Sequence, residues 1–233
     1  MTAATLVTGL LWFLAFLFST TVHEAMHAFV AFRGGDATAY HGGQVSLSPI
    51  PHIRREPIGM LVVPLLTALT QGWAIGWAST PYNPAWAAAY PRRAALMAAS
   101  GPFGNVLVAA VALVLLRLGL SVGWFASPEY VNFQQLVVGA DGGASFAGTL
   151  LSILLTLNVL LAVFNLIPLP PLDGASVLGL FLTPEMSRTV RQLSRSPMFQ
   201  LIGLLIAWRI FPALVRPLFG LILALVYPGL HYS

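Results

Sequence analysis

The residues of this chain best suited to chemistry are His23-Glu24-Ala25-Met26-His27, two histidines four positions apart with a glutamate beside the first. Positions i and i+4 lie on one face of an α-helix, about one turn apart, so both imidazoles can reach a single tetrahedral zinc ion. Glu24 lies next to them and can take a proton from a water molecule bound to that ion. The spacing therefore predicts one zinc ion with an acid–base residue beside it.

The surroundings of this motif strengthen the prediction. It lies inside the apolar stretch at residues 5–32, which we expect to be a retained membrane span that ends at Gly34-Gly35. An ionisable group at membrane depth costs about 2.5–3.5 kcal/mol and marks a functional site by default. The alternative is that the motif lies in water, beyond the bilayer at the helix end. Ser19 and Thr20, one turn earlier on the same face, are small polar groups that could support the histidines.

Two histidines leave a catalytic zinc site incomplete, because such a site has three protein ligands and an open position. The remaining histidines all lie in predicted polar segments: His41, His52 and His231. Among the acids, Asp173 follows the fourth apolar stretch in a proline-rich turn closed by Gly174. On spacing alone, Asp173 is equally well interpreted as the third zinc ligand or as the N-cap of a short helix at 175–182.

The composition indicates where these residues work. The chain has 233 residues, of which 58% are hydrophobic and 8% charged, whereas a soluble domain carries about a quarter charged residues. The apolar runs are continuous, which excludes an outer-membrane barrel with its alternating pattern. We therefore expect one all-α polytopic domain over residues 1–233 whose partner is the lipid bilayer, with a catalytic core at about 5–182 and a C-terminal membrane segment at 198–228.

The charged residues give an orientation signal. All 11 basic residues are arginine and the net charge is +4. The arginines fall in separate short loops, which suits anionic lipid headgroups and is a poor footprint for nucleic acid. With no cysteine, the chain has neither disulfides nor a thiolate metal site.

About four to six membrane segments are expected, in this order along the chain: 5–32, 57–77, 94–120, 149–166 and 198–227. The second is interrupted by Pro64, Gly72 and Gly76, and helix breakers at this depth indicate backbone that is buried or lines a cavity. The alternation of polar and apolar residues at 44–48 predicts a small β-hairpin after the first helix. That strand could receive an unwound substrate by β-addition or only pack over the site.

If Asp173 is the third zinc ligand, the shared metal imposes a topology. His23 and Asp173 both lie near the C-terminal ends of their apolar stretches, so the first and fourth stretches must run parallel. One full span, 94–120, lies between them, so 57–77 must be re-entrant or cross an even number of times. Re-entry also gathers eight arginines on one side: Arg33, Arg54, Arg55, Arg92, Arg93, Arg188, Arg191 and Arg195. The positive-inside rule then predicts a metal site toward the cytoplasmic side.

Three elements in order resemble the site-2 protease family of intramembrane zinc metalloproteases, in its compact branch without a PDZ or CBS domain. They are His23-Glu24-x-x-His27, Gly101-Pro102-x-x-Asn105, and Asn165 through Pro168-Leu169-Pro170-Pro171 to Asp173-Gly174. The resemblance implies hydrolysis of peptide bonds in transmembrane protein or peptide substrates. It covers roughly residues 15–180. The richness in arginine and alanine without any lysine indicates a GC-rich prokaryotic genome, so the expected location is the inner (plasma) membrane of a prokaryotic cell.

The resemblance also implies roles for individual residues. His23, His27 and Asp173 would hold Zn²⁺, one ion per chain, and Glu24 would be the catalytic base. Asn165 would hold substrate or stabilise the oxyanion, or else satisfy the broken helix before Pro168. Asn105 is expected to support packing around a helix break at Gly101-Pro102.

Two features depart from the branch's pattern, and two rival functions remain. The loop histidine His52 is followed by Arg54-Arg55-Glu56, and no lysine precedes the segment Pro81-Tyr82-Asn83-Pro84. One rival is a non-catalytic relative that binds membrane helices, for which Glu24 would be unnecessary. The other is a transporter with a broken-helix site, although the chain shows no pair of matching halves.

Overall fold

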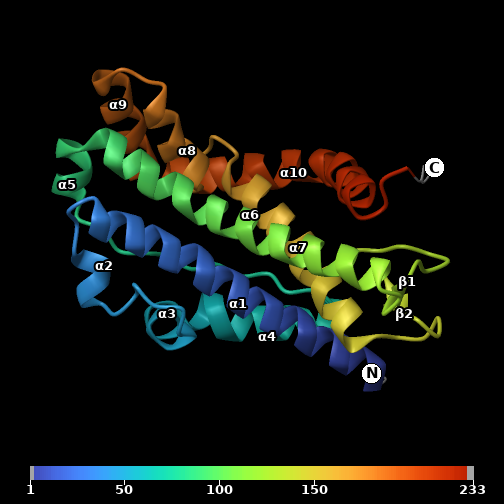
Figure 1. The fold of residues 1–233 in the computed structure, drawn as a ribbon. Helices are drawn as coiled ribbons and strands as arrows, with labels where there is room; N and C mark the ends of the chain where they lie inside the picture. The colour runs from blue at the N-terminus through green and yellow to red at the C-terminus, as the bar shows by residue number, and fades with distance from the viewer. Residues whose placement is uncertain (1–2, 230–233) are drawn as a thin grey trace.

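Long helices dominate the protein, a computed structural model of which describes residues 3–229 (Figure 1). Four helices are long and apolar enough to cross a membrane: α1 (Ala3–Arg33), α6 (Pro91–Ser121), α7 (Phe146–Asn165) and α10 (Pro197–Val226). This confirms the all-α polytopic class; with the shorter apolar helix Ile58–Gln71, the number of membrane segments lies within the expected range. Helix α6 continues through Gly101-Pro102, with Pro102 inside it. The helix break predicted at this position is therefore wrong.

The remaining elements are short and lie between the long helices. They are α2 (Thr38–His41), α3 (Pro49–Arg55), a π-helical turn (Ile58–Val62), α4 (Val63–Gln71), α5 (Pro84–Ala89), β1 (Phe125–Ala126), β2 (Val138–Gly139), α8 (Asp173–Val177), a 3₁₀ turn (Leu178–Leu180) and α9 (Pro184–Ser194). In Figure 1, α2, α5 and α9 lie toward one end of the long helices, and the β1–β2 pair lies at the other end.

Helices α1 and α7 run parallel, as the shared-metal argument predicted. Trp12 of α1 packs in one cluster with Ile153 of α7, and further along both helices Asn158 donates a hydrogen bond to Ser19 at 2.8 Å. Helix α6 runs antiparallel beside α1 (Figure 1). Small buried residues such as Ala28 and Ala31 line the inner face of α1, and small residues allow membrane helices to approach closely.

The stretch at 57–77 enters the bundle and returns on the side where it began. The π-helical turn and α4 run toward the N-terminal end of α1, where the space beside Gly9 is filled by the Ala68 carbonyl. After a left-handed turn at Gly72, the chain comes back without regular structure. The Ser79 hydroxyl then donates a 2.6 Å hydrogen bond to Glu56, which joins the two ends of the stretch. This geometry agrees with the predicted re-entrant segment.

The returning limb is anchored beyond the end of α1 by Asp36. Its carboxylate accepts hydrogen bonds from the Thr38 hydroxyl and from the backbone N–H of Asn83, both at 2.6 Å. Burial opposes ionisation of Asp36, but these hydrogen bonds outweigh it and lower the pKa of the carboxyl below its ordinary value. As an anion, the side chain therefore joins the segment after α1 to the returning limb at Asn83.

The hairpin predicted at 44–48 is wrong. These residues form bends between α2 and α3, and the antiparallel pair β1–β2 lies instead between α6 and α7. The polar residues of the alternation have other partners: Ser46 accepts from the N–H of Ser48, and Ser48 caps α3 through the N–H of Ile50. Gln44 is buried and donates to the Ser79 carbonyl. Serine side chains that bond to nearby backbone compete with a strand ladder.

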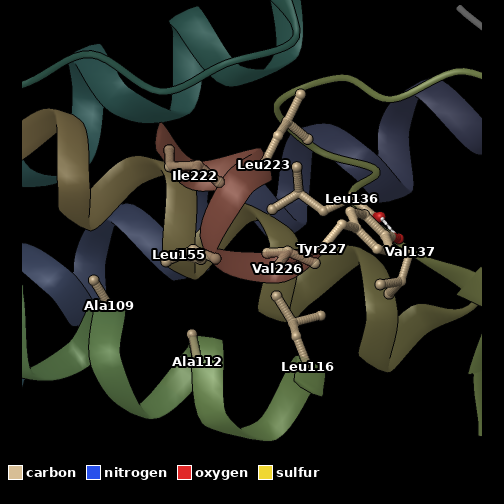
Figure 2. Close-up of a cluster of buried hydrophobic side chains, with 10 residues drawn as sticks. All are labelled: Ala109, Ala112, Leu116, Leu136, Val137, Leu155, Ile222, Leu223, Val226 and Tyr227. Atoms are coloured by element: carbon tan, nitrogen blue, oxygen red, sulfur yellow. Dashed lines mark hydrogen bonds between the residues drawn. The ribbon is translucent and has the colours of Figure 1, made fainter. Parts of the chain in front are cut away.

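Apolar packing closes the end of the bundle remote from the histidines. Figure 2 shows the cluster contributed by α6, α7, the end of α10 and the loop before β2: Ala109, Ala112, Leu116, Leu136, Val137, Leu155, Ile222, Leu223, Val226 and Tyr227. The Tyr227 hydroxyl donates to the Leu136 carbonyl at 2.6 Å, so its one polar atom is satisfied. This contact fixes the end of α10 against the loop.

The other end of α10 supports the turn that precedes α8. A Cβ at Gly203 would collide with the carbonyl oxygen of Pro170, so only glycine permits this approach. Ala207 packs with Ile167 and Leu172 in one apolar cluster, and Phe211 stacks edge-on against Phe164. Helix α10 thereby packs against the proline-rich turn that leads into α8.

Candidate metal centre

The two histidines of the H-E-x-x-H motif lie on the inner face of α1, buried among helices. Their Nε2 atoms are 3.0 Å apart, as positions one turn apart allow. The other ring nitrogen of each histidine has a carbonyl partner: Asn105 Oδ1 at 2.6 Å from His23 Nδ1, and Met97 O at 2.7 Å from His27 Nδ1. Both partners belong to α6, so that helix orients the two rings.

Asp173 completes the cluster from the opposite side. Its Oδ2 lies 3.1 Å from His23 Nε2 and 3.3 Å from His27 Nε2. Asp173 is the first residue of α8; the N-cap position is occupied by Leu172, and no side chain caps this helix. The N-cap interpretation of Asp173 is therefore wrong.

Gly174 allows α8 to begin where it does. A Cβ at this position would collide with the carbonyl oxygens of Leu166 and Ile167, just beyond the end of α7. Any larger residue would push α8 away from α7 and withdraw Asp173 from the histidines. The sequence Asp173-Gly174 is thus explained by packing as well as by chemistry.

The three atoms that meet here fit a zinc ion. In neutral imidazole one nitrogen carries a proton and the other a lone pair. Since the Nδ1 atom of each neutral ring donates to a carbonyl oxygen, each Nε2 presents its lone pair. The two lone pairs face the carboxylate oxygen of Asp173, with no hydrogen atom between the nitrogens and that oxygen. Three acceptors at such distances repel one another unless a cation lies among them. Two imidazole nitrogens and one carboxylate oxygen are ligands typical of catalytic zinc, which keeps a fourth position open.

A buried amide network supports His23 from behind. Asn105 Nδ2 donates to Asn158 Oδ1 at 2.8 Å, and Asn158 donates in turn to the Ser19 hydroxyl. The interpretation of Asn105 as a packing residue missed its bond to His23. Asn158 was also missed, although an amide in the middle of the apolar α7 was a visible signal. Ser19 supports the histidine as expected, through the amides, whereas Thr20 contributes no hydrogen bond to the ring.

Glu24 is buried beside the cluster and has a partner that sequence reasoning missed. The hydroxyl of Thr80 lies 2.6 Å from Glu24 Oε2 and 3.0 Å from the Glu24 carbonyl oxygen, so it can donate to either. Thr80 lies on the returning limb of the re-entrant segment, 56 positions away. No local pattern could have indicated this contact, because it depends on the path of that limb.

These residues line a cavity of about 430 Å³ between α1, α6, α8 and α9. Asn165, the last residue of α7, also lines it, and its amide donates to the Leu161 carbonyl at 3.0 Å. Both interpretations of Asn165 therefore retain support. His41 is exposed on α2 and His52 is buried near Ser46, so neither joins the cluster, and His231 lies outside the described residues.

Comparisons with known proteins agree with this chemistry. Residues 11–209 match peptidase family M50. The chain is 31% identical over 175 residues to "Putative zinc metalloprotease YwhC" of Bacillus subtilis, a match that covers 75% of this chain and 70% of the relative. It is 29% identical over 206 residues to "Putative zinc metalloprotease Rip2" of Mycolicibacterium smegmatis, covering 88% and 69%. No solved structure matches.

Proposed function

Because this chain belongs to peptidase family M50, the site-2 protease family of zinc metalloproteases, we propose that it cleaves transmembrane proteins or peptides within the bilayer. His23, His27 and Asp173 hold the zinc ion, and Glu24 is the general base. The observation that carries the proposal is the convergence of three acceptor atoms, two of them on a helix long and apolar enough to cross a membrane.

The chain's own groups divide the work of hydrolysis. Zinc, when bound, acidifies a water molecule and polarises the scissile carbonyl. Glu24 accepts the proton of the attacking water and later delivers it to the leaving nitrogen. Thr80 holds the Glu24 carboxylate in place through its hydroxyl. Asn165 lines the same cavity, where its amide can hold the substrate backbone or the developing oxyanion.

The proposal extends to orientation in the membrane. The ends of the re-entrant segment meet through Glu56 and Ser79, so the loops that follow α1 and precede α6 lie on one side. The adjoining ends of α1 and α6, the segments between them, and α9 with its C-cap carry eight arginines, and the positive-inside rule supports a cytoplasmic location for them. The active site then opens toward the cytoplasmic side of a prokaryotic inner (plasma) membrane.

Because the chain contains no cysteine, single cysteines can report this orientation. Leu47→Cys and Ala88→Cys replace exposed residues on the arginine-rich side, and Ala144→Cys replaces one in the loop between α6 and α7. A membrane-impermeant thiol reagent added outside intact cells should label Ala144→Cys alone. Labelling of Leu47→Cys and Ala88→Cys on opposite sides would contradict re-entry.

The enzymatic proposal is tested by measuring bound zinc and cleavage in the same preparations. A library of single-span transmembrane peptides in liposomes is digested and the products are identified by mass spectrometry. His23→Ala and Asp173→Ala should lose zinc, whereas Glu24→Gln should keep zinc and lose cleavage. His41→Ala, at an exposed histidine outside the cluster, is the matched control. Cleavage that persists in Glu24→Gln would refute the assignment.

A further inference from the structure

Helix α9 covers one side of the active-site cavity with a single face. Ser187, Val190, Arg191 and Ser194 line the cavity, and their spacing places them together along the helix. The hydroxyl of Thr183 caps the first turn. The opposite face is exposed, so α9 separates the cavity from the surroundings.

Arg191 and Arg195 both line the cavity; Arg195 is exposed, whereas the Nη2 atom of Arg191 is buried without a hydrogen-bond partner. Arginine stays charged in proteins and carries five N–H donors, so an unpaired buried donor calls for an acceptor. Among the described residues, the recorded ion pairs join only Asp173 to the two histidines, and none involves Arg191.

The charges around Arg191 do not satisfy it. Burial, and then the neighbouring Arg188 and Arg195, lower the pKa of Arg191, and the Tyr82 hydroxyl is the one group that acts in the opposite direction. The acids that face the same cavity are Glu24, bonded to Thr80, and Asp173, which faces the histidines. The guanidinium is therefore in a cationic neighbourhood that attracts an anion.

We propose that Arg191 binds a carboxylate of the peptide substrate and so selects the cleavage site. The proposal rests on the proteolytic function proposed above. A guanidinium presents a planar pair of donors that matches a carboxylate in bidentate geometry. Small apolar residues such as Ala94, Ala95 and Ala98 line the wall contributed by α6, so they contribute no side-chain donor that competes for that anion.

The position of Arg191 favours a substrate carboxylate over a lipid phosphate. Arg191 lines the cavity, and its Nη2 atom is buried. Arg188, one turn earlier, is exposed and does not line the cavity. A phosphate headgroup at the membrane surface would meet Arg188 first. Arg191 lines the cavity in which the peptide must lie to reach Glu24, so a carboxylate of that peptide comes within reach of its guanidinium.

The carboxylate has two sources, an acidic side chain near the scissile bond or the free C-terminus of a trimmed substrate. To separate these two sources, we compare peptides that carry Gln or Glu at one position beside the scissile bond, moving that position in turn through a peptide that the wild-type enzyme cleaves. A second set compares free C-terminal carboxylates with amides at increasing distance from the scissile bond. Charged hydrogen bonds change affinity by about tenfold to a hundredfold, so kcat/KM should rise by that factor in one arm.

The variants assign this preference to a residue. In Arg191→Gln, the ratio of kcat/KM for the acidic substrate to kcat/KM for the neutral one should fall to about one, mainly through KM. Arg191→Lys should restore part of this ratio. Arg188→Gln, the matched control on the exposed face, should keep the wild-type ratio. Zinc content and thermal stability are measured for each variant. If Arg191→Gln does not fold, the proposal is tested by the substrate series with the wild-type enzyme and by the preference of Arg191→Lys.

Three results would overturn the proposal. The wild-type enzyme could show no preference for the acidic substrate, the preference could survive in Arg191→Gln, or Arg191→Gln could lose the preference only in vesicles of phosphatidylglycerol. The last would identify a lipid contact. Cleavage that persists in Glu24→Gln would instead count against the proteolytic site itself, so the two failures are distinguishable.

Discussion

Replacing Gly101 with alanine should abolish zinc binding through one methyl group. A Cβ at Gly101 lies 2.6 Å from His23 Nε2 and closer still to His27 Nε2. Non-bonded heavy atoms need about 3.5 Å, so the His23 ring must retreat by about 0.9 Å and the His27 ring by more. Ligand distances at a metal site tolerate about 0.2 Å. The methyl group therefore displaces both imidazoles from any common ion.

The expected loss is large. Disturbing the partners of metal ligands costs about tenfold to a hundredfold in affinity, and here two ligands themselves are displaced. We expect zinc affinity to fall at least about a hundredfold, which corresponds to roughly 2.8 kcal/mol. Competition with a chelator measures this directly. The rise in melting temperature that zinc causes in the wild-type protein should also disappear.

Gly220→Ala is the matched control, because a Cβ there meets nothing within 4 Å and the residue also lies in a long helix. It should retain zinc, affinity and cleavage. If Gly101→Ala bound zinc as tightly as the wild-type protein, the two rings could not be oriented as described, and the three-ligand geometry would be refuted.

Three further predictions concern the residues around the centre. Asn105→Leu removes the acceptor of His23 Nδ1, so zinc affinity should fall about tenfold to a hundredfold in chelator competition; unchanged affinity would contradict the orienting role. Thr80→Val removes the bond to Glu24, so kcat should fall about tenfold with zinc retained, and Thr80→Ser should recover the rate. Because the pKa of Asp36 is lower in the folded than in the unfolded state, its stabilising contribution is complete above the ordinary pKa and disappears as pH falls through the folded value. Melting temperatures of wild type and Asp36→Asn should therefore differ near pH 6 and converge well below about pH 4; a constant difference would exclude ionisation as the cause.

Local geometry explains what could be predicted from sequence. The spacing of His23 and His27 determines their proximity once a helix forms, so the pair was predictable. Asp173 was not, because its distance from His23 depends on how α8 packs against α7. Its assignment as a ligand came from family resemblance, and the present geometry supports that proposal independently.

The failures have physical causes of the same kind. Ser46 and Ser48 produce an alternation that imitates a strand, but their hydroxyls bond to neighbouring backbone instead. Pro102 suggested a break, yet α6 continues through it. Thr80 offered no signal, since only the folded path of the re-entrant segment brings it to Glu24.

The contact between His23 and Asp173 joins positions 150 residues apart, and this separation has a consequence during biosynthesis. A ribosome adds about 5–20 residues per second, so His23 exists for roughly 8–30 s before Asp173 is made. Throughout that interval the nascent chain holds two of the three acceptor atoms and lacks the third. Other helices that enter the membrane beside the unfinished chain therefore meet an incomplete site. Hydrolysis can begin only after α7 has emerged and α8 has docked.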